Sequence, residues 1–140
     1  MENKTIAFIG GGNMTYCLVG GLIKSDFAPN KIWVSNPGQE KRDRLSLDFQ
    51  INTTHSNIDA AKVADVIVLS VKPALIEVVC KELAETISGK NVLVMSVAAC
   101  VDSHDIVTWL GGDIAVVRAM PNTPAFLSAG ACVLCANFRV

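Results

Sequence analysis

Short apolar runs alternate along the chain with segments in which apolar residues recur every three or four positions. The runs are typical of strands buried on both faces, and the recurring pattern is typical of helices that cover a sheet. We expect seven strands, at residues 5–9, 31–35, 51–53, 66–70, 92–96, 114–118 and 131–136.

The segments between these runs predict helices. Residues 14–22 place apolar side chains on one helical face, residues 40–49 predict a second, more polar helix, and residues 58–64 predict a short one. A longer helix is expected to begin near Pro73, and a last one to begin after the N-cap Asp102. Because strands alternate with helices, the pattern predicts an α/β fold with a Rossmann-like, doubly wound, mainly parallel sheet and helices on both faces.

The first strand and the helix after it are joined by the most informative motif. The apolar run at residues 6–9 leads into three glycines, and a helical pattern begins directly with Asn13 and Met14. Gly10 would permit a tight turn, and Gly12 would let the main chain approach a diphosphate at the start of the helix. The position after the first strand favours a nucleotide-binding loop over an ordinary glycine-rich turn.

Composition narrows the classes of function. The chain has 140 residues, is 51% hydrophobic and 18% charged, and carries a net charge of −1. This length suffices for one domain with its own core, and the charge gives no electrostatic case for nucleic acid or an anionic membrane as partner. No apolar run approaches a membrane span and the start shows no signal-peptide pattern, so we expect a cytoplasmic protein.

The five cysteines are odd in number and irregularly spaced, which is not typical of a disulfide framework. Cys132 and Cys135 form a Cys-x-x-Cys motif that would suit redox chemistry or a metal. On a strand, however, residues three apart point to opposite faces. We therefore expect buried thiols in a reducing compartment and no metal site.

Side chains after the second and third strands predict the adenosine end of a dinucleotide site. Ser35 and Asn36 stand where an acidic residue would reject a 2′-phosphate, and the basic Lys41 and Arg42 follow soon after. This favours NADP over NAD, although the same residues suit a plain polar turn and a solvated helix face. Asn57 would either cap the next helix or touch the adenosine.

Three further strand ends predict the nicotinamide end. Residues 71–73 follow the fourth strand, where Lys72 would lie beside the middle of the cofactor or would simply face solvent. The small residues at 96–100 suit the approach of a flat ring, or plain packing between helix and sheet. Prolines at 121 and 124 stiffen a segment in which Asn122 and Thr123 would orient a cofactor amide or a substrate, or form a structural turn.

Together these segments resemble pyrroline-5-carboxylate reductase. The matching stretches follow the family's order and cover nearly the whole chain, at residues 8–14, 71–73, 96–99 and 120–124. Val-Lys-Pro and Met-Pro-Asn-Thr-Pro are quite specific to this family, whereas the glycine turn fits its wider dehydrogenase superfamily. The resemblance implies an oxidoreductase of proline biosynthesis, which transfers hydride from NADPH or NADH to the C=N bond of 1-pyrroline-5-carboxylate and forms L-proline.

The resemblance also implies which residues bind the cofactor, while it leaves the catalytic residues unknown. By this resemblance, the diphosphate contacts Gly10, Gly12, Asn13 and Met14, and the adenosine contacts Ser35, Asn36 and Asn57. The nicotinamide lies against Val71, Lys72, Pro73, Ala98 and Ala99. The floor near the reacting carbon is formed by Met120, Asn122 and Thr123.

Some features depart from the family's pattern. Thr15 replaces a small residue, which would loosen the contact between the first helix and the sheet. Pro37 stands where many members carry arginine, which weakens the prediction of NADP as cofactor. Cys100 replaces a glycine. The family also has a second, helical domain that forms the homo-oligomer and most of the substrate pocket. We interpret residues 1–140 as the dinucleotide-binding domain with that second domain absent, and expect the isolated fragment to be weakly active or inactive.

Two alternative functions stay open. One is another hydride-transfer dehydrogenase of the same superfamily, which would act on a hydroxy acid. The other is a non-catalytic nucleotide-binding module that regulates a partner. The pair Asn122 and Thr123 disfavours the module, because a sensor needs no polar floor beside the reacting ring.

Overall fold

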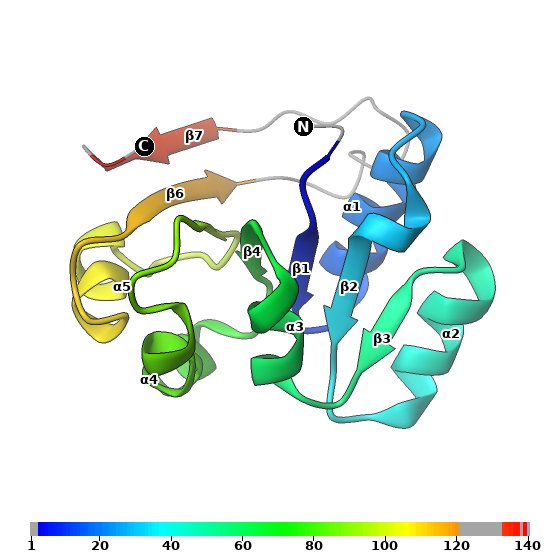
Figure 1. The fold of residues 1–140 in the computed structure, drawn as a ribbon, viewed down its shortest axis with the longest axis horizontal. Coiled ribbons are helices and arrows are strands. Elements are labelled where there is room, and N and C mark those ends of the chain that lie inside the picture. Colours follow the sequence, from blue (N-terminus) through cyan, green and yellow to red (C-terminus); the bar gives the residue numbers. More distant parts are fainter. Residues whose placement is uncertain (1–2, 121–132, 138, 140) are drawn as a thin grey trace.

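Seven strands form one sheet in the computed structural model, which describes residues 3–120, 133–137 and 139 (Figure 1). Their order across the sheet is β3-β2-β1-β4-β5-β6-β7. Neighbouring strands are parallel except β6 and β7, which are antiparallel. The order confirms the doubly wound fold, because the chain builds the sheet outward from β1 first in one direction and then in the other.

The strands and helices lie close to their expected positions. The strands are β1 (Ile6–Ile9), β2 (Ile32–Ser35), β3 (Asn52–Thr54), β4 (Val66–Leu69), β5 (Leu93–Ser96), β6 (Ala115–Met120) and β7 (Val133–Ala136). The helices are α1 (Asn13–Lys24), α2 (Gln39–Phe49), α3 (Asn57–Val63), α4 (Ile76–Ile87) and α5 (Ser103–Trp109), with short 3-10 turns η1 (Pro29–Lys31) and η2 (Pro73–Leu75). Residues 131 and 132, expected in the last strand, lie outside the described residues.

The helices cover the two faces of the sheet in two groups. On one face, Phe8 and Val34 join a buried cluster with Val19 of α1 and Leu45 of α2. On the other face, the cluster contains buried residues of α3, α4 and α5 packed against β1, β4, β5 and β6. Because successive residues of a strand face opposite ways, each central strand contributes to both cores, which explains the unbroken apolar runs.

Two expectations about helices are corrected in part. The most buried positions of α1 are Thr15, Val19 and Gly20, so its buried side is rotated from the face that the apolar positions at 14–22 indicated. The long helix does begin near Pro73, but its first turn is the 3-10 turn η2, and α4 follows from Ile76.

The expectation of buried thiols holds for only part of the cysteines. Cys80 is buried and Cys17 is half-buried, but Cys100 and Cys135 are exposed. Cys135 lies on the edge strand β7, which only β6 pairs among the described strands. Cys132 lies outside the described residues.

Residues at or near the ends of the parallel strands form a row at the carboxyl edge of the sheet. Ile9 pairs with Ser35 on one side and Leu69 on the other, and the register continues through Ser96 to Arg118. The loops that follow these residues therefore meet at one edge, where ligands of open α/β sheets bind.

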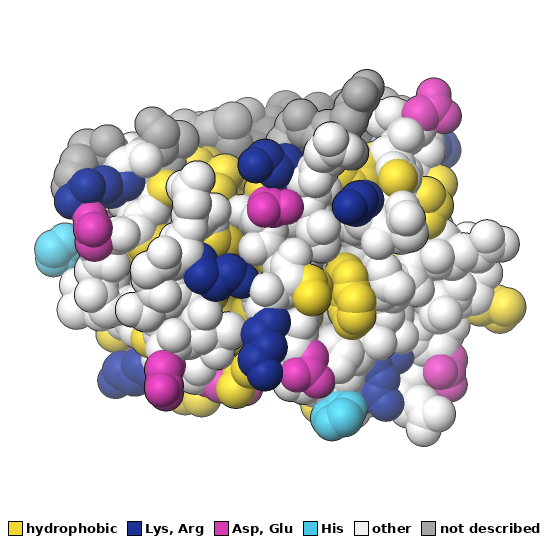
Figure 2. Space-filling view, in the orientation of Figure 1, with side chains coloured by type: hydrophobic (Ala, Val, Ile, Leu, Met, Phe, Trp, Pro, Cys, Tyr) yellow, Lys and Arg dark blue, Asp and Glu magenta, His cyan; other side chains and the backbone are white. Residues whose placement is uncertain are grey.

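Charges of both signs are dispersed over the face in Figure 2, where lysine and arginine side chains alternate with acidic ones. This agrees with the net charge of −1. Within the described ranges, no helix has the length and hydropathy needed to cross a membrane.

Candidate functional site

The turn after β1 depends on Gly10. Its φ of +105° lies in a region that side chains rarely adopt, and a Cβ atom there would lie 2.6 Å from the main-chain oxygen of Ser70. Its N–H donates to the main-chain oxygen of Ser35 over 2.9 Å. The turn is thus pressed between the ends of β2 and β4, and only glycine fits this close approach.

Gly12 has the opposite surroundings. It is the N-cap of α1, its φ is an ordinary −78°, and no side chain caps the helix. A Cβ atom at Gly12 would meet nothing within 4 Å, so the space above it is open. The first N–H groups of a helix have no partner within the helix, so those at Asn13 and Met14 are available to an anion in this space.

Thr15 ties the turn to the helix instead of loosening it. The side chain is fully buried, and its hydroxyl donates to the main-chain oxygen of Gly10 over 2.5 Å. The expectation of a loosened helix–strand contact is therefore wrong, because the threonine hydroxyl satisfies a carbonyl that a smaller residue would leave to another donor.

Asn36 and Arg42 shape the turn after β2. The Asn36 side chain accepts from the N–H of Gly11 over 3.1 Å and donates to the carbonyl of Gly38 over 3.1 Å. The Arg42 guanidinium donates to the carbonyls of Asn36 and Pro37, over 2.8 and 3.0 Å. The glycine turn and the β2 turn are therefore joined directly, with a half-buried cation beside them.

Ser35 and Asn57 contact one another. Ser35 is fully buried and its hydroxyl donates to Oδ1 of Asn57 over 2.7 Å, so it holds Asn57 rather than presenting its own hydroxyl at the surface. Nδ2 of Asn57 donates to Glu82 of α4 over 3.1 Å. The N-cap of α3 is Ser56, whose hydroxyl accepts from the N–H of Asp59, so the capping interpretation of Asn57 is wrong.

The residues expected at the nicotinamide end also lie at the carboxyl edge. Val71 is half-buried against the core, whereas Lys72 and Pro73 are exposed at the start of η2. Ala98 is buried and Ala99 is exposed in the loop after β5.

The same edge continues through the next loop and strand. Cys100 adopts a φ of +62°, a conformation that glycine takes most easily, which explains the glycine usual at this position. Met120 ends β6 and is 44% exposed. Asn122 and Thr123 lie outside the described residues.

The sequence did not single out Thr15 or Glu82 as part of the site, and it named Arg42 only as a following basic residue. The charge of Arg42 and its position soon after β2 could have indicated that it belongs to the site. Glu82 had none, because it lies 25 residues from Asn57 along the chain. Within the described residues, no group of three or more His, Cys, Asp or Glu side chains is arranged to hold a metal ion.

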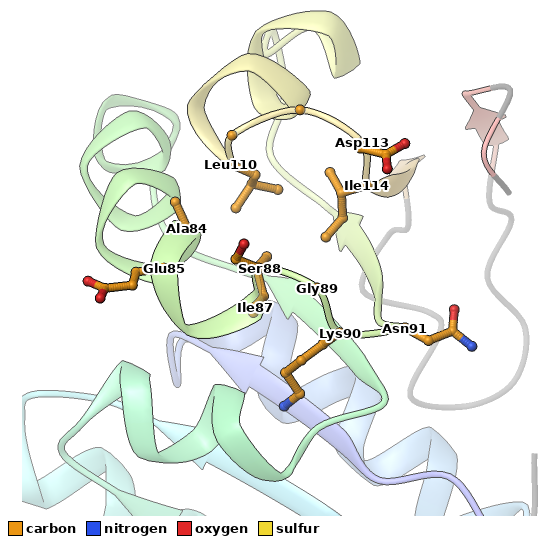
Figure 3. Close-up of a pocket in the computed structure, with 12 residues that line it drawn as sticks. Ala84, Glu85, Ile87, Ser88, Gly89, Lys90, Asn91, Leu110, Asp113 and Ile114 are labelled. Atoms are coloured by element: carbon orange, nitrogen blue, oxygen red, sulfur yellow. The ribbon is translucent and has the colours of Figure 1, made fainter.

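A hollow of about 690 Å³ lies at the other end of the sheet, where β5 and β6 begin (Figure 3). It lies between the loop after α4 and the loop after α5, and Leu110 and Ile114 line it. Lys90 also borders it, but its ammonium donates to the carbonyls of Ala61 and Lys62 at the end of α3. This hollow is separate from the carboxyl edge that carries the glycine turn.

Comparison with known proteins gives consistent results. The sequence model of the family described as "NADP oxidoreductase coenzyme F420-dependent" matches residues 5–100. The pyrroline-5-carboxylate reductase of Pseudomonas aeruginosa is 43% identical over 140 residues, which are 100% of this chain and 51% of that protein.

Solved structures show the same similarity. A pyrroline-5-carboxylate reductase from Coxiella burnetii has a TM-score of 0.94 and 44% identity, covering 98% of this chain and 51% of that chain. The Plasmodium falciparum pyrroline carboxylate reductase, solved with NADP bound, has a TM-score of 0.88 and 25% identity, covering 100% of this chain and 50% of that one. The chain spans about half the length of the curated relatives it matches.

Proposed function

The chain belongs to the oxidoreductase family described as "NADP oxidoreductase coenzyme F420-dependent", and from this premise we propose that it is the cofactor-binding half of a 1-pyrroline-5-carboxylate reductase. In this role, residues 1–140 bind the nicotinamide dinucleotide at the carboxyl edge of the sheet. A second domain, of the kind that the resemblance implies, completes the substrate pocket and the oligomer.

The observation that carries this proposal is the contrast between the two glycines of the turn. A Cβ atom would collide with the main chain at Gly10 but would meet only open space at Gly12. Packing does not require glycine at position 12, where φ is ordinary and no side chain caps the start of the helix. An open space beside helix N–H groups is what a diphosphate needs, and a side chain at Gly12 would fill it.

The turn after β2 supports NADP as the preferred cofactor. Arg42 holds the carbonyls of Asn36 and Pro37 with one nitrogen, and a guanidinium carries further N–H donors for a 2′-phosphate. Arg42 thus supplies at this turn the charge that Pro37 lacks. Residues 35–39 contain no carboxylate that would repel a phosphate.

The reaction needs orientation more than acid–base chemistry. The bound cofactor would supply a hydride to the imine carbon, and one proton from solvent would complete L-proline. A protonated imine accepts hydride readily, so this half of the protein has to fix the position of the nicotinamide. Val71, Ala98 and Ala99 form the wall for the ring in this proposal, and Met120 lies at its floor.

A fluorescence titration with NADPH and NADH tests the proposal. We expect the unaltered chain to bind both, with NADPH binding more tightly. Gly12→Val should weaken both by about tenfold or more, because the side chain occupies the diphosphate space. Leu47→Val changes an 82% exposed residue of α2 and serves as the control. Equal binding by the Gly12→Val protein, with an unchanged melting temperature, would refute the proposed site.

A further inference from the structure

The amide of Asn57 is held from two sides by side chains of different chemistry. Its Oδ1 accepts from the Ser35 hydroxyl over 2.7 Å, and its Nδ2 donates to a carboxylate oxygen of Glu82 over 3.1 Å. The three residues come from β2, α3 and α4, so the tertiary structure alone brings them together.

Glu82 is the partner that decides which way the amide points. A hydroxyl can donate or accept, so Ser35 would tolerate either orientation of the Asn57 amide. An ionised carboxylate only accepts, and it would repel Oδ1 if the amide were turned by 180°. Only the observed orientation satisfies both contacts, and its bond to Glu82 is charge-assisted.

In this orientation, one N–H of the Asn57 side-chain amide is available to a ligand. Nδ2 carries two hydrogens, and it donates one of them to Glu82 in a hydrogen bond. Among the described residues, no other side chain or main-chain oxygen bonds to Nδ2 of Asn57. Asn57 follows the end of β3, and β3 and β2 are tied at this edge by the bond from the Asn36 N–H to the Thr54 carbonyl. The second N–H of Asn57 therefore lies at the edge of the sheet where the adenosine is proposed to bind.

We propose that Glu82 is a positioning residue that orients the Asn57 amide, so that its second N–H donates to an acceptor atom on the adenosine half of the dinucleotide. This inference rests on the proposed function, which places the adenosine at this edge. Glu82 itself does not touch the cofactor in this arrangement. Without the carboxylate, the amide can turn and present its oxygen to the ligand, which repels an acceptor.

Two substitutions separate orientation from simple loss of a contact. Glu82→Gln can donate or accept and frees the amide, whereas Glu82→Lys can only donate and forces the opposite orientation. Glu85 lies on the same helix, is also exposed, and borders the hollow at the other end of the sheet. Glu85→Gln and Glu85→Lys therefore make the same charge changes away from Asn57.

The binding experiment uses fragments of the cofactor. We expect Glu82→Lys to bind ADP-ribose about tenfold more weakly than Glu85→Lys, with Glu82→Gln between Glu82→Lys and the unaltered chain. Nicotinamide mononucleotide should bind all five proteins alike. Equal ADP-ribose binding by Glu82→Lys and Glu85→Lys would overturn the inference.

A nuclear magnetic resonance measurement tests the orientation without any ligand. The side-chain amide signals of Asn57 should shift in both Glu82 variants and stay in place in both Glu85 variants. Unmoved signals would overturn the inference even if cofactor binds. If the signals move but the unaltered chain binds neither dinucleotide nor ADP-ribose, the proposed function fails and the adenosine role of Asn57 fails with it, whereas the orientation of the amide by Glu82 stands.

Discussion

Single polar side chains hold the turns of the carboxyl edge in place before a ligand binds. Thr15 bonds to the Gly10 carbonyl, Asn36 joins the N–H of Gly11 to the carbonyl of Gly38, and Arg42 bonds to the turn after β2. Order that exists before binding does not have to be created during it, so such contacts lower the entropic cost of association.

Arg42 allows a test of cofactor preference at this scale. Arg42→Gln should weaken NADPH binding about tenfold more than NADH binding, because only NADPH carries the 2′-phosphate that a guanidinium bonds with two N–H groups. Loss of the Arg42 bonds to the turn should affect both nucleotides alike. Calorimetric titration with both nucleotides at low and high salt measures this.

Lys41→Gln is the matched control for that experiment. Lys41 is the preceding residue of α2, it is exposed, and its loss changes the net charge by the same amount. Similar losses of NADPH affinity in both variants would show that net charge, rather than the Arg42 guanidinium, decides the preference.

At the scale of elements, the junction between β1 and α1 combines two demands in three glycines. Gly10 serves the packing of the turn against β4, whereas Gly12 leaves space at the helix start. The two roles predict that the same small substitution lowers stability more at Gly10 than at Gly12.

Gly10→Ala should lower the free energy of unfolding by about 2 kcal/mol or more, because the new Cβ meets the Ser70 carbonyl and the residue keeps a positive φ. Gly12→Ala should cost less than about 1 kcal/mol, the usual effect of alanine at an N-cap. Urea denaturation followed by circular dichroism gives both values. Equal losses in the two proteins would contradict this division of roles.

At the scale of the whole molecule, two apolar cores lie on opposite faces of one sheet. Cys80 of α4 is fully buried in the core formed with α3 and α5, and this burial raises the pKa of its thiol to about 12. The unfolded thiol titrates near 9.0, so the unfolded chain loses its proton first as the pH rises. The contribution of Cys80 to stability is therefore present below pH 9 and is lost as the pH approaches 12.

Alkylation with iodoacetamide checks this burial. At pH 8 we expect Cys100 and Cys135, both exposed, to react in the folded protein, whereas Cys80 should react only after denaturant is added. Peptide mass spectrometry assigns the label to each cysteine. Fast labelling of Cys80 without denaturant would contradict the packed core between α4 and the sheet.

The sequence alone determined the class of fold and predicted the place of the candidate site. Strand positions, helix positions and the glycine turn are local properties, because apolar runs, N-caps and positive φ values depend on neighbouring residues. The apolar face of α4 was also predictable, and Ile76, Val79, Leu83 and Ile87 are buried as the spacing indicated. The same local reasoning placed Ser35, Asn36 and Asn57 at the carboxyl edge.

Only the tertiary structure decided which of these residues contact one another. In the folded chain, Ser35 is buried and bonds to Asn57, and Ser56 is the N-cap of α3. Thr15 bonds to the Gly10 carbonyl of the glycine turn, and Cys100 is exposed. Glu82 shows the physical reason most clearly, because α3 and α4 meet on one face of the sheet only after the chain has passed through β4 between them. Contacts between distant elements depend on register and packing, which no local pattern of residues encodes.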